Sequence, residues 1–164
     1  MPNFFTRNKN QQVTLLAPLT GSVIPLTEVP DPVFSQKMMG DGIAILPTEG
    51  LLVAPTDGVV SHLFPTHHAI VINSIDGLDI LLHIGIDTVN AKGNGFLPHV
   101  STNSQVKAGD PLISFDLDTL QTFGCPLVTP IVIANSERVD HMQRSDHKTV
   151  NAGLHPLMTL RLKP

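Results

Sequence analysis

The stretch HHAIVINSIDGLDILLHIGI, residues 67–86, decides the fold, because it has the pattern of a β-hairpin. Two runs rich in Ile, Leu and Val flank Asp76-Gly77, a dipeptide typical of tight hairpin turns. Side chains alternate between the two faces of a strand, so the even-numbered residues 80–86 should face a core. The odd-numbered residues 81–87 should lie on the other face, and His83 is among them.

Hairpin geometry brings a second histidine, His68, close to His83. If the loop consists of residues 74–77, the two histidines face each other directly. If it consists of Asp76-Gly77 alone, His68 faces Gly85 and lies diagonally across from His83. Directly opposed residues have Cβ atoms about 4.5–5.5 Å apart, and diagonal ones about 7–8 Å apart. Both registers therefore predict a pair of imidazoles on one face of the hairpin.

Two adjacent imidazoles with free nitrogen atoms suit either phosphoryl transfer or metal binding. A neutral histidine, with an ordinary pKa of about 6.5, can attack phosphorus at neutral pH without a strong base, while its neighbour donates a hydrogen bond to the phosphoryl oxygens. For zinc, His68 and His83 supply only half of a tetrahedral site unless Asp87 or a partner contributes. A purely structural pair of hydrogen-bonded histidines is the third interpretation.

Strand-like runs separated by Gly, Pro, Asp and Asn continue along the chain and predict an all-β fold, an antiparallel sandwich or barrel. Beside the hairpin, these runs are VTLLAPLTGSVIPL, GDGIAILPTEGLLVAPTDGVVSHLF, QVKAGDPLISFDL, PLVTPIVIAN and LMTLRLK. Only DPVFSQKMMG, residues 31–40, and LDTLQTFG, residues 117–124, predict short helical turns. The pattern A-P-x-x-G-x-V-x-x-L occurs at residues 17–26 and again at 54–63, and each copy predicts a proline-led turn, a tight glycine and a strand.

Length and composition bound the class of protein. A chain of 164 residues with 41% hydrophobic and 15% charged residues predicts one globular domain. The net charge of −4 and the absence of Trp and Tyr argue against nucleic-acid binding. The lone cysteine, Cys125, allows no internal disulfide bond and should be buried, which fits a reducing, cytoplasmic location.

The two ends of the chain differ in pattern. Residues 1–12 predict a flexible N-terminal segment, and residues 13–164 predict the folded domain. The N-terminal segment lacks the apolar core of a signal peptide, and no run approaches the ~20 apolar residues of a membrane span. We therefore expect no transmembrane segment.

Taken together, these motifs resemble the glucose-type IIA component of the bacterial phosphoenolpyruvate:sugar phosphotransferase system. The resemblance covers about residues 15–162, and it is carried by APLTGSVIPLTEVPDPVFSQKMMGDGIAILP, VAPTDGVVSHLFPTHHAIVI, LLHIGIDTVNAKGNGF, VKAGDPLISFDL and TPIVIAN. It implies a β-sandwich of the duplicated-hybrid-motif type. It also implies a phosphotransferase component that accepts a phosphoryl group from the histidine carrier protein HPr and passes it to a cysteine of a IIB domain.

The resemblance also assigns residues to roles. The phosphorylated histidine of the family corresponds to His83, which attacks through Nε2, and the auxiliary histidine corresponds to His68. Thr66 corresponds to a threonine that hydrogen-bonds within the site, and Asp31 and Asp87 correspond to acidic residues that meet arginines of the partner proteins. The apolar rim that binds partners would be formed by Val33, Phe34, Met38, Met39, Phe64, Ile70 and Leu81.

The same resemblance implies no required cofactor, with neither ATP nor magnesium, although His68 and His83 could still hold a zinc ion. The IIB partner belongs to a membrane IIBC permease, so the protein could work at the inner face of the membrane. A regulatory IIA-like binding module that no longer transfers phosphate is one alternative, and regulatory targets beside phosphotransfer stay open. A zinc metallohydrolase is the other, because HIGID satisfies the ligand spacing H-x-x-x-D. The sugar is not encoded: glucose, N-acetylglucosamine, sucrose and β-glucosides all fit.

Overall fold

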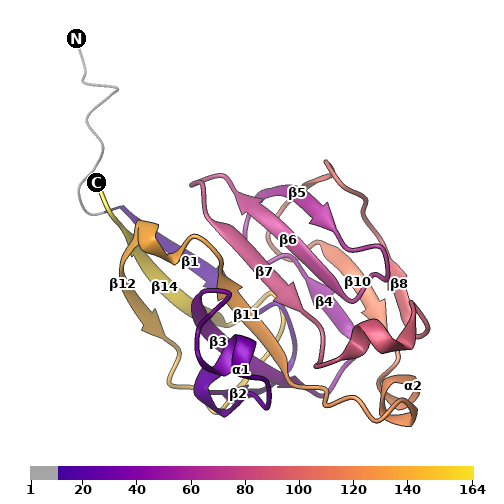
Figure 1. Cartoon of the computed structure of the whole chain (residues 1–164). Helices are drawn as coiled ribbons and strands as arrows, with labels where there is room; N and C mark the ends of the chain where they lie inside the picture. The colour runs from indigo at the N-terminus through magenta and orange to yellow at the C-terminus, as the bar shows by residue number, and fades with distance from the viewer. Residues whose placement is uncertain (1–10) are drawn as a thin grey trace.

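The computed structural model describes residues 11–164 and confirms the all-β prediction, because antiparallel strands dominate this part of the chain (Figure 1). Strand β1 (Gln12–Leu16) already begins at Gln12. Residues 1–10 of the predicted flexible segment 1–12 lie outside the described residues.

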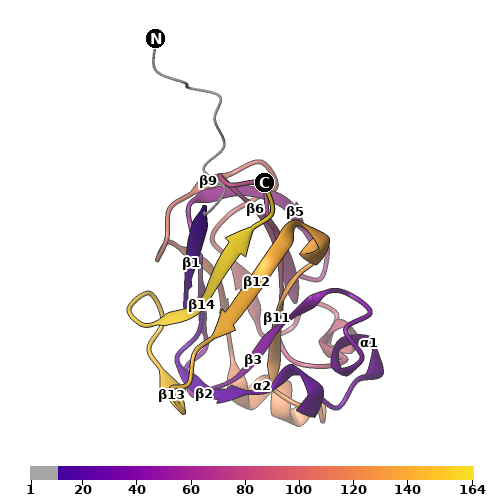
Figure 2. The ribbon, with the colours of Figure 1, turned by 90° about the vertical axis from the view of Figure 1, so that its left-hand side faces the viewer.

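Within residues 11–164, the strands form one sheet of eight strands and two sheets of three. The large sheet has the order β13-β2-β3-β11-β7-β6-β5-β9, and the small sheets have the orders β1-β14-β12 and β4-β10-β8. The strands of the large sheet are β2 (Gly21–Ile24), β3 (Asp41–Pro47), β5 (Gly58–Leu63), β6 (Ala69–Ser74), β7 (Asp79–His83), β9 (Gln105–Val106), β11 (Thr129–Ile133) and β13 (Thr149–Val150). Those of the small sheets are β4 (Leu51–Val53), β8 (Phe96–Pro98), β10 (Pro111–Phe115), β12 (Val139–Arg144) and β14 (Pro156–Leu162), in addition to β1. Figure 2 shows β1, β14 and β12 side by side, facing the viewer.

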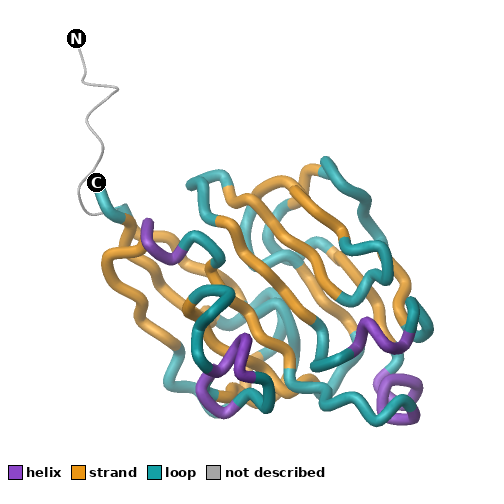
Figure 3. The backbone as a smooth tube through the Cα atoms, viewed as in Figure 1, coloured by secondary structure: helices purple, strands orange, loops and turns teal. Residues whose placement is uncertain are grey.

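The predicted helical turns are both confirmed, and they are short (Figure 3). Helix α1 (Pro32–Ser35) is capped by Asp31, whose carboxylate accepts a hydrogen bond from the backbone N–H of Val33 at 2.9 Å. Helix α2 (Leu117–Thr122) is capped in the same way by Asp116. The 3₁₀ helices are η1 (Leu26–Glu28), η2 (Thr88–Ala91) and η3 (Ser136–Arg138). No helix in residues 11–164 is long and apolar enough to cross a membrane.

The β6–β7 hairpin has a register that neither predicted loop gives. Its loop is the three residues 75–77: the N–H of Ser74 donates to the carbonyl of Leu78, and Gly77 stands at a φ of +88°. A turn of this length that ends in a left-handed glycine is a common hairpin connection. As a result Ala69, and not His68 or Ile70, is paired with His83. Both predicted registers were therefore wrong by one position.

Strand alternation divides the buried residues between two apolar clusters. Ile80 and Leu82 of β7 point into the main core, together with residues of the two small sheets. Leu81 points to the opposite face of the large sheet, where a second cluster includes Leu26, Val29 and Phe34. The chain from η1 to α1 thus covers the outer face of the large sheet. Because His83 alternates with Leu82, its side chain emerges on this outer face, beside α1.

The repeated sequence pattern corresponds to two similar corners of the large sheet. Gly21 begins β2 and Gly58 begins β5, and each of these strands lies near one edge of the sheet. An added Cβ would come within 2.0 Å of a carbonyl oxygen of the neighbouring strand at Gly21, and within 2.3 Å of one at Gly58. Both glycines are therefore required by the close approach of a neighbouring strand.

Candidate functional site

The site begins with His83, the last residue of β7. Its Nδ1 lies 2.7 Å from the carbonyl oxygen of Gly85. A carbonyl oxygen can only accept, so Nδ1 carries the proton and Nε2 keeps its lone pair. Gly85 reaches this position with a φ of +69°, and an added Cβ there would lie 2.7 Å from the side chain of Thr88. The sequence analysis gave Gly85 no role as a hydrogen-bond partner of His83, although a glycine inside a strand pattern is a signal for such a close backbone approach.

His68 lies outside the strands and is buried, with 6% of its surface exposed. Its ring centroid is 5.1 Å from that of His83, and the two planes are inclined at 79°. In the observed register, regular strand alternation would have placed His68 on the face of the sheet opposite to His83. Alternation stops at Ala69, because the chain turns there and His67 has a left-handed backbone with a φ of +61°. The predicted pair thus forms through a turn and not through strand pairing.

Thr66, for which the resemblance implies a hydrogen bond within the site, contacts His68, with its hydroxyl oxygen in hydrogen-bond contact with Nδ1 of the ring. When the hydroxyl donates this bond, the proton of a neutral His68 sits on Nε2. His68 then offers a donor, while His83 offers a lone pair. A phosphoryl group bound to Nε2 of His83 could accept this hydrogen bond.

Burial keeps both imidazoles neutral. Desolvation, together with the nearby His83 ring, lowers the pKa of His68 from 6.5 to about 4. Desolvation also lowers the pKa of His83, although the Gly85 carbonyl and the carboxylates of Asp31 and Asp87 act in the opposite direction. A neutral His83 is the nucleophilic form, so the site is ready for attack at neutral pH.

The two acidic residues flank His83 from different elements. Asp31 caps α1, and Asp87 precedes η2 in a left-handed conformation with a φ of +59°. Asp87 is exposed and Asp31 is partly exposed, and both influence the pKa of His83 through their charge. The carboxylates therefore lie near His83 and are accessible from the solvent.

Aromatic rings extend the site on both sides of the histidine pair. The ring of Phe34 lies 5.1 Å from that of His83, and the ring of Phe64 lies 5.5 Å from that of His68. The Phe34 contact is tilted and the Phe64 contact is edge-on, and such ring contacts restrict the orientation of both imidazoles. Phe64 in turn contacts His62 at 4.7 Å.

Exposure separates the predicted rim into two groups. Val33, Met38 and Met39 are exposed, at 38%, 68% and 43%, and Phe64 is partly exposed. The other three predicted rim residues are buried, namely Ile70, Phe34 and Leu81. Their prediction as partner-binding residues is therefore corrected. Strand alternation points Ile70 into the main core. Leu81 and Phe34 belong to the second cluster, where the chain from η1 to α1 covers the outer face of the sheet.

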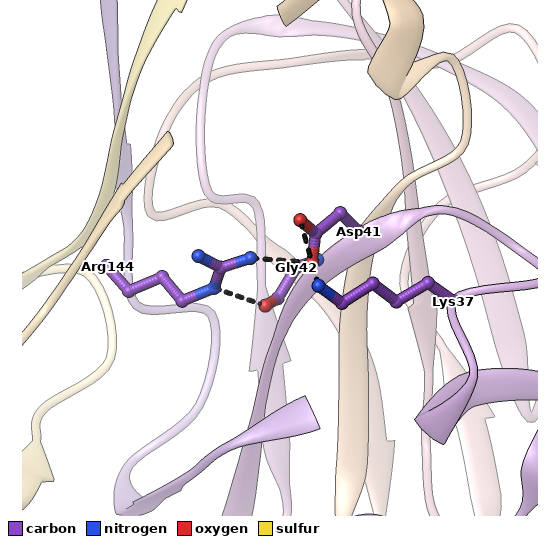
Figure 4. Close-up of polar contacts among 4 residues, drawn as sticks. All are labelled: Lys37, Asp41, Gly42 and Arg144. Carbon is purple, nitrogen blue, oxygen red and sulfur yellow. Dashed lines mark hydrogen bonds and ion pairs between the residues drawn. The ribbon is translucent and has the colours of Figure 1, made fainter. Parts of the chain in front are cut away.

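A cluster of charges that the sequence analysis did not predict anchors the chain after α1 (Figure 4). Asp41 accepts a hydrogen bond from Arg144 at 2.6 Å, and Lys37 lies 3.6 Å from its other oxygen. Arg144 also donates to the carbonyl of Gly42 at 2.8 Å. Burial alone would raise the pKa of Asp41, but the hydrogen bonds and the two cations together lower it. Nothing in the local sequence signals a contact between residues 103 positions apart.

The described residues give little support to a resident metal. Residues 11–164 contain no group of three or more His, Cys, Asp or Glu side chains placed to hold an ion. Zinc on His68 and His83 would thus need further ligands from another molecule, since two imidazoles leave a tetrahedral site half open. The zinc hydrolase alternative is not supported by this geometry.

The fold and the site define a class of protein: a β-sandwich with two neutral, adjacent histidines, one of which presents a free Nε2 beside acidic residues and an exposed apolar surface. Known proteins identify the family. Residues 13–139 match the family described as phosphoenolpyruvate-dependent sugar phosphotransferase system, EIIA 1, so the chain belongs to this family. It is a phosphocarrier component of that system, and it takes part in phosphotransfer between components.

Similar proteins agree with this assignment over nearly the whole chain. A glucose-specific EIIA component from Bacillus anthracis is 46% identical over 156 residues, covering 95% of this chain and 94% of that protein. One from Oceanobacillus iheyensis is 44% identical over 148 residues, covering 90% of each. Among solved structures, the glucose permease IIA from Mycoplasma capricolum superimposes with a TM-score of 0.81 at 35% identity, covering 92% of this chain and 96% of that one.

Proposed function

We propose that His83 is the residue that carries the phosphoryl group. The observation that supports this proposal is the pairing of two neutral imidazoles whose Nδ1 atoms are both engaged, by Gly85 on one ring and by Thr66 on the other. Only the Nε2 atoms remain available for chemistry. Nε2 of His83 attacks phosphorus, a new N–P bond forms, and the N–P bond to the histidine of phosphorylated HPr breaks.

The second half of the reaction reverses the role of His83. A thiolate of the IIB cysteine attacks the phosphoryl group, an S–P bond forms, and the bond to Nε2 breaks. His68 donates a hydrogen bond to the phosphoryl oxygens, which contributes most in this second transition state as the group leaves His83, and Thr66 orients its ring. The reaction balances without ATP, a metal or another cofactor, because the phosphoryl group only changes its carrier.

The partners are proposed from the surface around His83. Asp31 and Asp87 would meet arginines of HPr and of IIB, and these cations would offset the repulsion between the carboxylates and the phosphoryl group. Val33, Met38, Met39 and Phe64 would form the contact surface around them. Methionine side chains adapt to more than one partner, which suits a protein that must bind a donor and an acceptor in turn.

Sugar and location follow from the acceptor and not from this chain. The similar proteins named above are glucose-specific, so we infer that the acceptor is a glucose-type IIBC permease. The protein would then act in the cytoplasm, beside the inner face of the membrane, with residues 13–164 as one EIIA domain. Pairing the phosphorylated protein with permeases for glucose, N-acetylglucosamine, sucrose and β-glucosides would identify the sugar.

A phosphorylation assay tests the central step. The protein is incubated with phosphoenolpyruvate, enzyme I and HPr, and its mass is measured. We expect the mass to rise by one phosphoryl group, and we expect no rise for His83→Ala. The control is His141→Ala, which removes an exposed imidazole on β12 and should leave acceptance unchanged. If His83→Ala still takes up phosphate, the nucleophile is another residue and the proposal is wrong.

A further inference from the structure

Two buried threonine hydroxyls hold the backbone next to His83. Thr88 and Thr129 are both fully buried, at 0% exposure. The hydroxyl of Thr88 donates to the carbonyl of Ile84 at 2.6 Å, and the hydroxyl of Thr129 accepts from the N–H of Gly85 at 3.2 Å. The carbonyl of Ile84 and the N–H of Gly85 belong to one peptide group. The two threonines therefore hold the same peptide group through its oxygen and its nitrogen.

The next peptide group along the chain is held as well. The N–H of Ile86 donates to the carbonyl of Pro126 at 2.9 Å, and this peptide group contains the Gly85 carbonyl that accepts from His83. The Thr129 hydroxyl is itself oriented, because it donates to the carbonyl of Leu127 at 3.0 Å. Residues 126–129 thus form a fixed support for Gly85, and Thr129 belongs to β11, which pairs with β7 in the sheet.

Gly85 needs such a support because its own backbone is unrestrained by a side chain. Glycine populates many conformations at little cost, and a free Gly85 would let its carbonyl turn away from the imidazole. Without that acceptor, the proton of a neutral His83 would distribute between Nδ1 and Nε2. Every molecule with the proton on Nε2 has lost the lone pair that attacks phosphorus.

We propose that Thr88 and Thr129 are positioning residues, which fix Gly85 so that the proton of His83 stays on Nδ1 and Nε2 remains nucleophilic. The inference rests on the proposed role of His83 as phosphoryl acceptor. Groups that orient a metal-ligating histidine through its other ring nitrogen change metal affinity or activity by about 10-fold to 100-fold, and we take this as the scale for the orientation of His83. We expect the rate of phosphoryl acceptance to fall by about 10-fold when either hydroxyl is removed.

The variants are Thr129→Val and Thr88→Val, which keep the shape of the side chain and remove the hydroxyl. Thr129→Ser restores the hydroxyl and should behave like the wild type. The matched control is Ser74→Ala: Ser74 is also buried and its hydroxyl also accepts from a backbone N–H, but at the opposite end of the same hairpin. This control loses a buried hydrogen bond without touching Gly85.

The decisive readout is the ¹⁵N NMR spectrum of the His83 ring in the unphosphorylated protein, followed by the single-turnover rate of acceptance. We expect wild type, Thr129→Ser and Ser74→Ala to hold the proton on Nδ1, and both valine variants to shift part of it to Nε2. Folded valine variants with an unchanged spectrum would refute the inference. If the valine variants do not fold, the wild-type spectrum still decides, because a proton on Nε2 there would contradict it.

This design separates the inference from the proposed function. The ring spectrum is recorded without HPr or IIB, so it reports the tautomer even if phosphate is found on another residue. Phosphorylation away from His83 would refute the proposed function, whereas an unaffected tautomer would refute the role of Thr88 and Thr129.

Discussion

Burial of His68 should make the domain sensitive to mild acid. The pKa of this imidazole is about 4 in the folded protein, against an ordinary value of 6.5. At pH values between these two pKa values the unfolded chain binds more protons than the folded one, so the free energy of unfolding decreases as the pH falls. The stabilisation that a neutral His68 provides is complete above pH 6.5 and is lost progressively toward pH 4. Linkage gives a loss of about 2 kcal/mol between pH 7.5 and pH 5 from this residue.

The perturbation that tests this is His68→Gln, because glutamine has no titratable group. The assay is urea unfolding at pH 7.5 and at pH 5, followed by far-ultraviolet circular dichroism, since the chain has no Trp or Tyr for intrinsic fluorescence. We expect the free energy of unfolding of the wild type to fall by about 2 kcal/mol more than that of the variant between pH 7.5 and pH 5. His83 contributes with the same sign, because its pKa is also lowered, and this contribution should persist in the variant.

An exposed histidine provides the control for this experiment. His141→Gln on β12 should show the same loss as the wild type. If wild type and His68→Gln lose the same free energy of unfolding, burial does not suppress protonation of His68, and the explanation for its neutral state fails.

Four substitutions test other parts of the structure. In His68→Gln, phosphate should still reach His83, but donation to IIB should fall by about 10²–10³-fold, because a well-placed donor to developing charge is lost. Single-turnover rates of both half-reactions check this: equal losses in the two directions, or no loss in either, would contradict a transition-state role for His68. Gly85→Ala should lower the free energy of unfolding by about 2–4 kcal/mol in chemical denaturation. The φ of +69° strains any residue with a Cβ, and this Cβ would lie 2.7 Å from the methyl group of Thr88. Unchanged stability would refute the tight turn. Arg144→Gln should lower the free energy of unfolding by about 1 kcal/mol in the same assay, because it removes an ion pair and a hydrogen bond to the Gly42 carbonyl. The control Arg161→Gln breaks a more exposed ion pair and should lower it by less than about 0.5 kcal/mol. Similar losses would show that the bond from Arg144 to the backbone contributes nothing.

Much of the site could be predicted from the sequence because its signals are local. Alternation along residues 80–84 assigned the core and outer faces of β7 correctly, since a strand allows only two side-chain directions. Asp31 and Pro32 marked the start of a helix, and Asp76-Gly77 marked a hairpin turn. Each of these features depends on a few neighbouring residues, and the sequence alone determined them.

The edge strand β12 shows where such local reasoning stops. Its residues are all exposed or partly exposed, so it has no alternation from which a strand could be predicted. It forms because it pairs with β14 and because Arg144 bonds to Asp41 and Gly42, far away in the sequence. Pairing at a sheet edge depends on what the rest of the chain presents there, and that is decided only on folding.

The same division runs through the histidine pair. The sequence by itself determined that His68 and His83 flank one hairpin and that one of them could act as a nucleophile. Only the tertiary structure decided how they meet, because a loop of three residues shifted the register and a turn before Ala69 brought His68 back to the same face. It also decided which nitrogen of His83 is free and that both rings are neutral, since these properties arise from the Gly85 carbonyl and from the burial of the two rings. Hydrogen bonds to a ring and its desolvation depend on groups that meet only when the sheet is complete.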